Sequence, residues 1–180
     1  MRFLTFALLI LLVSCQQKSE KEIQAEKNLA LTTRFFTEVY GTNNLAPLQE
    51  LFASDYQHID TEDVEMTGMR AIELPCMTIF NALPNCKVEI MSAAADDEKA
   101  IFQIRLVSDL PKMANPETFV DQINFPESWT FWVKDGKIVK GQQISSYLNL
   151  VKQLSGYDGG IIKINSILKK YYEEQKAGNK

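Results

Sequence analysis

The stretch that decides the fold is ESWTFWVKDGKIVKGQQISSY, residues 127–147. Two runs rich in aromatic and β-branched residues flank the dipeptide Asp135-Gly136, which suits a primed two-residue turn. The stretch therefore predicts a β-hairpin with strands over 127–135 and 137–147. Alternation along a strand places Trp129 and Phe131 on one face of the first strand and Trp132 on the other. It also places Gln143 and Ser145 together on the second strand.

Two further strands are predicted before this hairpin, KVEIMSAAA over 87–95 and AIFQIRLVSD over 100–109. On the second, Gln103 and Arg105 share the face opposite Phe102, Ile104 and Leu106. This polar face either lines a pocket or faces solvent, because antiparallel sheets commonly have one wet side. The segment 110–126 contains three prolines and reads as a long loop holding a short strand around Thr118–Ile123.

The first half of the chain shows helical spacing instead. Apolar residues recur every three or four positions over 22–40, 45–56 and 69–83, which predicts three helices. Pro75 inside the third predicts a kink. A short strand is expected over Tyr56–Asp60, followed by a polar loop over 61–68. Helices followed by consecutive strands indicate the α+β class, as a curved, cone-shaped antiparallel sheet wrapped by three helices.

The two ends of the chain differ from this central region. Residues 1–14 have a short basic start and an apolar run of signal-peptide length. Leu12-Val13-Ser14-Cys15 resembles the lipobox of bacterial lipoproteins, which implies cleavage before Cys15 and its diacylation. Residues 15–27 would then be a polar tether. Residues 156–180 predict an amphipathic C-terminal helix that caps the domain, mediates dimerisation or packs on its outside.

Composition excludes several classes of function. The net charge of −4 argues against a nucleic-acid-binding protein. The chain has one histidine, His58, and no CxxC, so no metal cluster is expected. Cys76 and Cys86 could form a disulfide in an oxidising compartment or be two small buried residues.

Several motifs, taken in order, resemble the SnoaL-like polyketide cyclases of the nuclear-transport-factor-2-like superfamily. They are FFTEVYGTNNLAPLQELFASDYQHID (35–60), GMRAI (68–72), LPNCKVEI (83–90), AIFQIR (100–105) and FWVKDGKIVKGQQISSYLNLVKQL (131–154). The resemblance covers about residues 28–155. It implies a bent sheet around an apolar pocket, and members that are cyclases, isomerases or non-catalytic binding domains, so the fold alone does not determine the function.

The resemblance also identifies candidate site residues. His58 matches the family's strand histidine and could act as a general base oriented by Asp60 or Tyr56, as a ligand contact, or structurally. In contrast, Lys, Gln and Ser occupy 140–146, where the family often carries carboxylates and tryptophan. The catalytic candidates are His58 and Asp60. The ligand-binding candidates are Tyr56, Gln103, Arg105, Trp129, Phe131, Gln143 and Ser145.

We therefore expect an exported, lipid-anchored protein that binds a small, mostly apolar molecule without catalysis, metal or organic cofactor. The alternatives are a cofactor-free cyclase or isomerase using His58 as base, and an envelope assembly protein. By resemblance to lipoprotein sorting, Gln16 after Cys15 favours the outer membrane of the bacterial envelope. Dimerisation through the sheet is expected by analogy with the family.

Overall fold

The hairpin around Asp135-Gly136 lies in the middle of a six-stranded sheet in the computed structural model, which describes residues 18–83, 85–109, 122–146, 149 and 153. Asp135 and Gly136 have φ of 51° and 73°, as the predicted primed turn requires. The turn joins β5 (Gln122–Lys134) to β6 (Lys137–Ser145). β3 (Lys87–Ala95) and β4 (Lys99–Asp109) extend the same antiparallel meander.

β1 (Phe52–Ile59) and β2 (Glu65–Thr67) complete the sheet, in the order β2-β1-β6-β5-β4-β3. β1 runs parallel to β6, whereas the other four neighbouring pairs are antiparallel. The expectation of a wholly antiparallel sheet is therefore wrong at this one pair. β1 and β6 are far apart in the chain, so no hairpin forces them to run in opposite directions.

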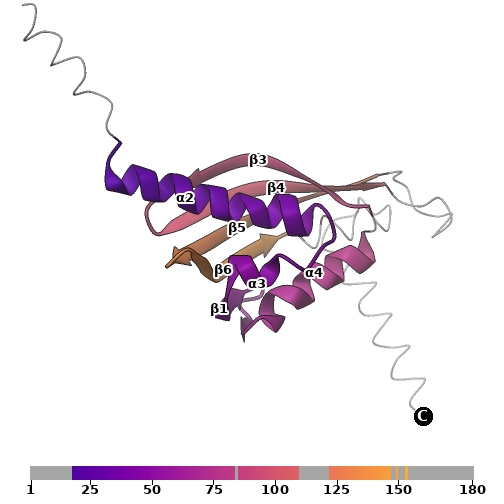
Figure 1. Ribbon diagram of the computed structural model, residues 1–180. Helices are drawn as coiled ribbons and strands as arrows, with labels where there is room; N and C mark the ends of the chain where they lie inside the picture. The colour runs from indigo at the N-terminus through magenta and orange to yellow at the C-terminus, as the bar shows by residue number, and fades with distance from the viewer. Residues whose placement is uncertain (1–17, 84, 110–121, 147–148, 150–152, 154–180) are drawn as a thin grey trace, which may run out of the picture.

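The helices cover one side of this sheet, which we call the inner face (Figure 1). α2 (Glu20–Arg34) starts with a capping box between Ser19 and Glu22 and packs against β3 and β4. It continues directly into a π-helix, η1 (Phe35–Tyr40). α4 (Arg70–Ala82) packs against β1 and β2, with Pro75 inside it. The α+β class and the curved sheet wrapped by helices are confirmed.

Several predicted boundaries were wrong, including that of the strand expected over Tyr56–Asp60, which runs from Phe52 to Ile59. The second helix, expected over 45–56, is only α3 (Leu48–Leu51), because from Phe52 onward the chain forms β1. The predicted polar loop over 61–68 contains β2, which pairs with β1. β5 begins at Gln122, so the loop expected to run to 126 ends earlier. Pro126 is tolerated inside β5 because it lies one residue beyond the last β5–β6 pair, Glu127–Ser145.

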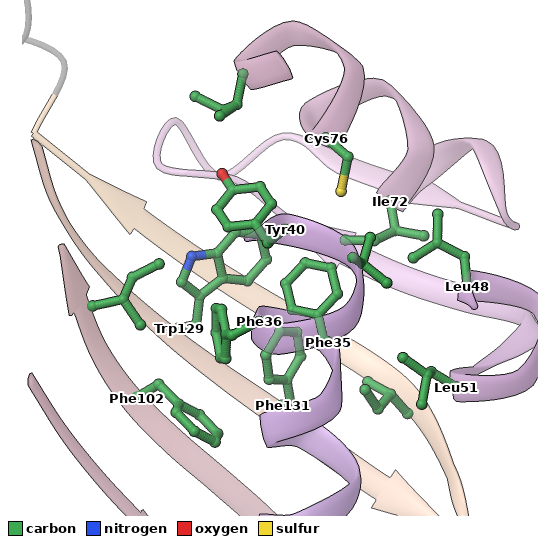
Figure 2. Packing of buried hydrophobic residues seen from close by; sticks show 14 of the residues in the cluster. Phe35, Phe36, Tyr40, Leu48, Leu51, Ile72, Cys76, Phe102, Trp129 and Phe131 are labelled. Carbon is green, nitrogen blue, oxygen red and sulfur yellow. The ribbon is translucent and has the colours of Figure 1, made fainter. Parts of the chain in front are cut away.

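The core fills the space between the helices and the inner face (Figure 2). Phe35, at the start of η1, is fully buried, and its ring lies 5.4–5.6 Å from those of Phe52, Trp129 and Phe131. The π-helix buries four of its residues in this core: Phe35, Phe36, Val39 and Tyr40. The core therefore joins the first long helix to the central strands.

The predicted signal peptide, Cys15, the start of the tether and the C-terminal extension lie outside the described residues. Within the described part of the chain, no helix combines the length and the apolar character that crossing a membrane requires.

Candidate functional site

A cavity of about 230 Å³ lies between α4 and the β2-β1-β6 end of the sheet. It is bounded by His58, Asp60, Met66, Leu74, Pro75, Thr78, Ile79 and Gln143. α4 supplies most of the apolar wall, and the sheet supplies most of the polar side chains. Ligand sites commonly combine an apolar lining with a few placed polar groups, so this cavity is the candidate site.

His58 reaches the site because successive side chains of β1 point to opposite faces of the sheet. Tyr56 and His58 are both fully buried on the inner face, as the predicted alternation requires. The imidazole lies beside Trp129, with ring centroids 5.7 Å apart. His58 is thus held between the cavity and the aromatic core.

The hydroxyl of Tyr56 holds one side of the His58 ring, at 3.1 Å from Nδ1. Gly141 of β6 is paired directly with His58 and makes room for this contact. A Cβ on Gly141 would lie only 2.1 Å from the Tyr56 hydroxyl oxygen. The Tyr56–His58 hydrogen bond therefore depends on a residue without a side chain at position 141.

The other imidazole nitrogen, Nε2 of His58, has no partner. It is the one buried side-chain nitrogen or oxygen atom without a hydrogen bond among the residues described. Burial lowers the pKa of His58 below its usual 6.5, and the nearby carboxylate of Asp60 opposes this shift only in part. His58 is therefore neutral at pH 7, and the hydrogen-bonding capacity of Nε2 is unused among the described residues.

Asp60 has a different role from the one predicted. Its carboxylate accepts hydrogen bonds from the backbone N–H groups of Glu62 (2.8 Å) and Val64 (3.0 Å). These bonds form an Asx turn that connects β1 to β2. Asp60 lines the cavity, but Tyr56 is the residue that orients His58.

Glu127 is a buried carboxylate that the sequence analysis did not identify as a site residue. It is 3 % exposed and accepts four hydrogen bonds. Oε1 accepts from Gln143 (2.8 Å) and Ser145 (3.0 Å). Oε2 accepts from the indole of Trp129 (2.8 Å) and the hydroxyl of Tyr40 (3.3 Å). Period-two alternation from Trp129 and Phe131 was the signal that could have placed Glu127 on the inner face.

Burial raises the pKa of Glu127, and the four hydrogen bonds oppose that rise. Four donors occupy the four lone-pair sites that an ionised carboxylate offers. Gln143 links this group to the cavity, since it lines the cavity and donates to Glu127. Glu127 therefore anchors the wall behind the cavity, and its own acceptor sites are already used.

The structure brings together most of the predicted site residues. Tyr56, His58, Trp129, Gln143 and Ser145 are connected on the inner face through the contacts above, while Phe131 lies in the aromatic core. Two predicted ligand residues are elsewhere. Gln103 and Arg105 lie on the opposite, outer face, where Arg105 is 3.6 Å from Glu89. Phe102, Ile104 and Leu106 take the inner positions of β4, so Gln103 and Arg105 do not share a cavity with His58.

Gln103 and Arg105 instead line a broad, open hollow of about 660 Å³ on the outer face. Met91 and Ile144 border the same hollow, and they are 52 % and 57 % exposed. Glu127 and Ser145 also border this hollow, so it adjoins the Glu127 network, although it shares no lining residue with the His58 cavity.

Cysteines and potential metal ligands are two further features of the described residues. Cys76 and Cys86 are both buried free thiols, and burial raises the pKa of Cys86 to about 11. Across the residues described, no three His, Cys, Asp or Glu side chains cluster in a way that could hold a metal ion.

Comparison with known proteins agrees with this fold. The family model described as a SnoaL-like domain matches residues 32–141. No curated protein sequence matches the chain.

Solved structures share the architecture at low sequence identity. A protein described as a SnoaL-like polyketide cyclase from Jannaschia sp. CCS1 aligns with a TM-score of 0.65 at 17% identity, covering 79% of this chain and 99% of its own. An LEH-like epoxide hydrolase of M. tuberculosis gives 0.56 at 12% identity, covering 73% and 91%. A protein with a ketosteroid isomerase-like fold from Catenulispora acidiphila DSM 44928, in complex with trimethylamine, gives 0.56 at 20% identity, covering 70% and 92%.

Proposed function

The chain belongs to the SnoaL-like domain family, and from that premise we propose that it binds a small, mostly apolar molecule in the cavity beside His58. Proteins with this fold bind small molecules or act as cyclases and isomerases. The observation that carries the proposal is the unpartnered, buried Nε2 of His58 at the wall of an otherwise largely apolar cavity. A ligand with one polar atom would satisfy that nitrogen while filling the apolar space.

Binding without catalysis fits the polar groups of the site best. Glu127 has all its acceptor sites occupied, and Asp60 is bonded to the β1–β2 turn. Glu127 therefore has no unused lone pair with which to accept a proton, and Oδ1 of Asp60 is held by the β1–β2 turn.

Titration of indane, an apolar bicyclic hydrocarbon, into the full chain tests the proposal. The informative variant is Leu74→Trp, because Leu74 borders the cavity and is 41 % exposed. Met77→Trp is the matched control, since Met77 lies on the same helix, is 44 % exposed and does not border the cavity. We expect calorimetric binding to wild type and Met77→Trp, and none to Leu74→Trp. Equal binding to all three proteins would reject this cavity as the site.

A cofactor-free cyclase or isomerase is the second candidate. Its support is that burial keeps His58 neutral at pH 7, the state in which an imidazole can accept a proton. A turnover screen with activated ketones tests it. Catalysis that survives in His58→Ala would remove this candidate.

The envelope location is a further part of the proposal. Its support is the sequence Leu12-Val13-Ser14-Cys15 after an apolar run. Labelling of growing cells with an alkyne-bearing palmitate should mark wild type and Cys86→Ser, but not Cys15→Ser. Gln16→Asp should move the labelled protein from the outer to the inner membrane on density fractionation.

Self-association through the outer face is also proposed. Met91, Ile101 and Ile144 are between 45 % and 57 % exposed there, and exposed apolar side chains in one region favour an interface. Sedimentation velocity should show a dimer for wild type that Ile144→Lys disrupts. Val64→Lys, at an exposed apolar residue before β2, is the matched control and should stay dimeric.

A further inference from the structure

We propose that Tyr56 fixes His58 as the neutral tautomer with its hydrogen on Nε2, so that the cavity selects molecules carrying a hydrogen-bond acceptor such as a carbonyl oxygen. This inference rests on the proposed function, because it names the chemical class of the molecule that the same cavity binds. The inference concerns the location of one hydrogen atom, which the positions of the other atoms constrain but do not show.

The Tyr56–His58 hydrogen bond can form in two ways, which correspond to the two neutral tautomers of His58. A neutral imidazole carries one N–H and the tyrosine carries one O–H. Only one of these hydrogens can lie between the Tyr56 oxygen and Nδ1, which are 3.1 Å apart. Within the described part of the chain, the Tyr56 hydroxyl has one hydrogen-bond partner, which is His58.

If Nδ1 carried the hydrogen and donated it to Tyr56, two groups would be left buried without a partner. These would be the phenol hydrogen and the lone pair on Nε2. If Tyr56 donates to Nδ1, the N–H on Nε2 and the lone pairs of the phenol oxygen are left, so either arrangement leaves one donor and one acceptor without a partner. The two arrangements differ in strength, because a phenol O–H is a stronger donor than a neutral imidazole N–H and an imidazole nitrogen is a stronger acceptor than a phenol oxygen. The hydrogen bond with Tyr56 as donor is therefore the stronger one and is favoured.

Gly141 strengthens this assignment by fixing the Tyr56 hydroxyl in place. The hydroxyl lies over the Gly141 Cα, where a Cβ would come within 2.1 Å of it. The phenol ring is also packed edge-on against Phe52, at 4.8 Å between centroids. Tyr56 is therefore a positioning residue that acts on the ligand through His58.

The consequence for the ligand is that His58 presents a hydrogen-bond donor. A ketone, ester or lactone oxygen would satisfy it, whereas a pure hydrocarbon would leave it unpaired. The same tautomer lacks the Nε2 lone pair that a general base needs. In any reaction, His58 would then stabilise negative charge on an oxygen and would not remove a proton.

Nitrogen-15 NMR of the imidazole tests the tautomer directly, because His58 is the sole histidine of the chain and needs no assignment. We expect the Nε2 signal of the full chain at the position of a protonated nitrogen and the Nδ1 signal at that of an unprotonated one. In Tyr56→Phe the two signals should move toward each other, since the donor to Nδ1 is gone. A protonated Nδ1 in wild type would overturn the inference.

Paired titrations of indane and 1-indanone, which differ by one carbonyl group, test the ligand class. Wild type should bind 1-indanone roughly three- to tenfold more tightly than indane, the range expected for one net hydrogen bond. In His58→Ala the ratio should fall to about one. Equal affinities in wild type, or a preference that persists in His58→Ala, would overturn the ligand class. If neither compound binds wild type, the proposed function fails, while the NMR result still decides the tautomer.

Discussion

Gly141 and Tyr56 compete for one space on the inner face of the sheet: a Cβ at position 141 would lie 2.1 Å from the Tyr56 hydroxyl oxygen. Because Gly141 is paired with His58 across β1 and β6, this space also decides whether Tyr56 can reach Nδ1. Gly141 of β6 therefore packs together with Tyr56 and His58 of β1 as one group of contacting residues.

Gly141→Ala should destabilise the protein by about 1–3 kcal/mol, because the added methyl group overpacks this space. Tyr56→Phe removes the oxygen that the methyl group would meet, so the double variant should lose less than the sum of the two single variants. Urea unfolding of all four proteins measures this coupling. Strict additivity would show that the Tyr56 hydroxyl does not occupy the space above Gly141.

Glu127→Gln should cost about 1–3 kcal/mol of unfolding free energy, because an amide replaces one acceptor oxygen of a buried, fully bonded carboxylate with a donor. Glu89→Gln is the matched control. Glu89 lies 3.6 Å from Arg105 on the outer face with its side chain 54% exposed, so its substitution should leave stability unchanged. Equal losses in both variants would contradict the anchoring role of Glu127.

The raised pKa of Glu127 predicts a pH dependence of stability. At pH values between the ordinary pKa of 4.5 and the higher pKa of the folded state, the carboxyl group of Glu127 keeps its proton in the folded protein and loses it in the unfolded chain. Stability due to Glu127 is therefore fully present below pH 4.5 and decreases as the pH rises through this window. The difference in unfolding free energy between wild type and Glu127→Gln, measured from acid to neutral pH, isolates the effect. A difference that grows with pH would contradict it.

His58 should titrate below pH 6.5, because burial disfavours its charged form. Below 6.5 the unfolded chain takes up a proton before the folded protein does, so stability due to neutral His58 is lost as the pH falls. The ring C–H signals of this single histidine give the midpoint by proton NMR. A midpoint above 6.5 would show that Asp60 outweighs burial.

Phe35→Ala should destabilise the fold by about 3–5 kcal/mol, the usual cost of deleting a buried aromatic ring. Phe35 contacts the rings of Phe52, Trp129 and Phe131, so its loss opens a space bordered by β1 and β5. Met77→Ala, at a residue 44 % exposed on α4, should change stability by only about 0.5 kcal/mol. Thermal unfolding of both variants compares the two sites.

Local patterns predicted most of the fold correctly. Asp135-Gly136 located the hairpin, and the alternation of Tyr56 with His58 predicted their common face. Tertiary packing decided the rest. Phe52 and Ala53 continue a helical pattern, but pairing with β6 draws them into β1. Likewise, nothing in the sequence of Phe35–Tyr40 distinguishes a π-helix from an α-helix, since the choice follows from how Tyr40 and Phe35 fit the core.

The site was harder to predict than the fold. His58 was identified because it is the one histidine, and Gln143 and Ser145 because they share a face. Glu127 was missed because its four partners come from η1, β5 and β6 and converge only in the folded protein. Gln103 and Arg105 could not be assigned to either face from the sequence, because alternation establishes which residues share a face, but packing decides which face is buried.

The parallel pairing of β1 with β6 has a consequence for the order in which the protein folds. β3 to β6 are successive antiparallel strands, and each can pair with its neighbour as soon as both have been synthesised. β1 is made early and can pair with β2 at once, yet its partner in the rest of the sheet is β6, the last of the described strands. Contacts between distant parts of a chain form slowly, because closing a long loop costs entropy. β1 and β2 therefore join the rest of the sheet only once β6 has formed, and a chain ending before β6 would lack the Gln143 side of the cavity beside His58.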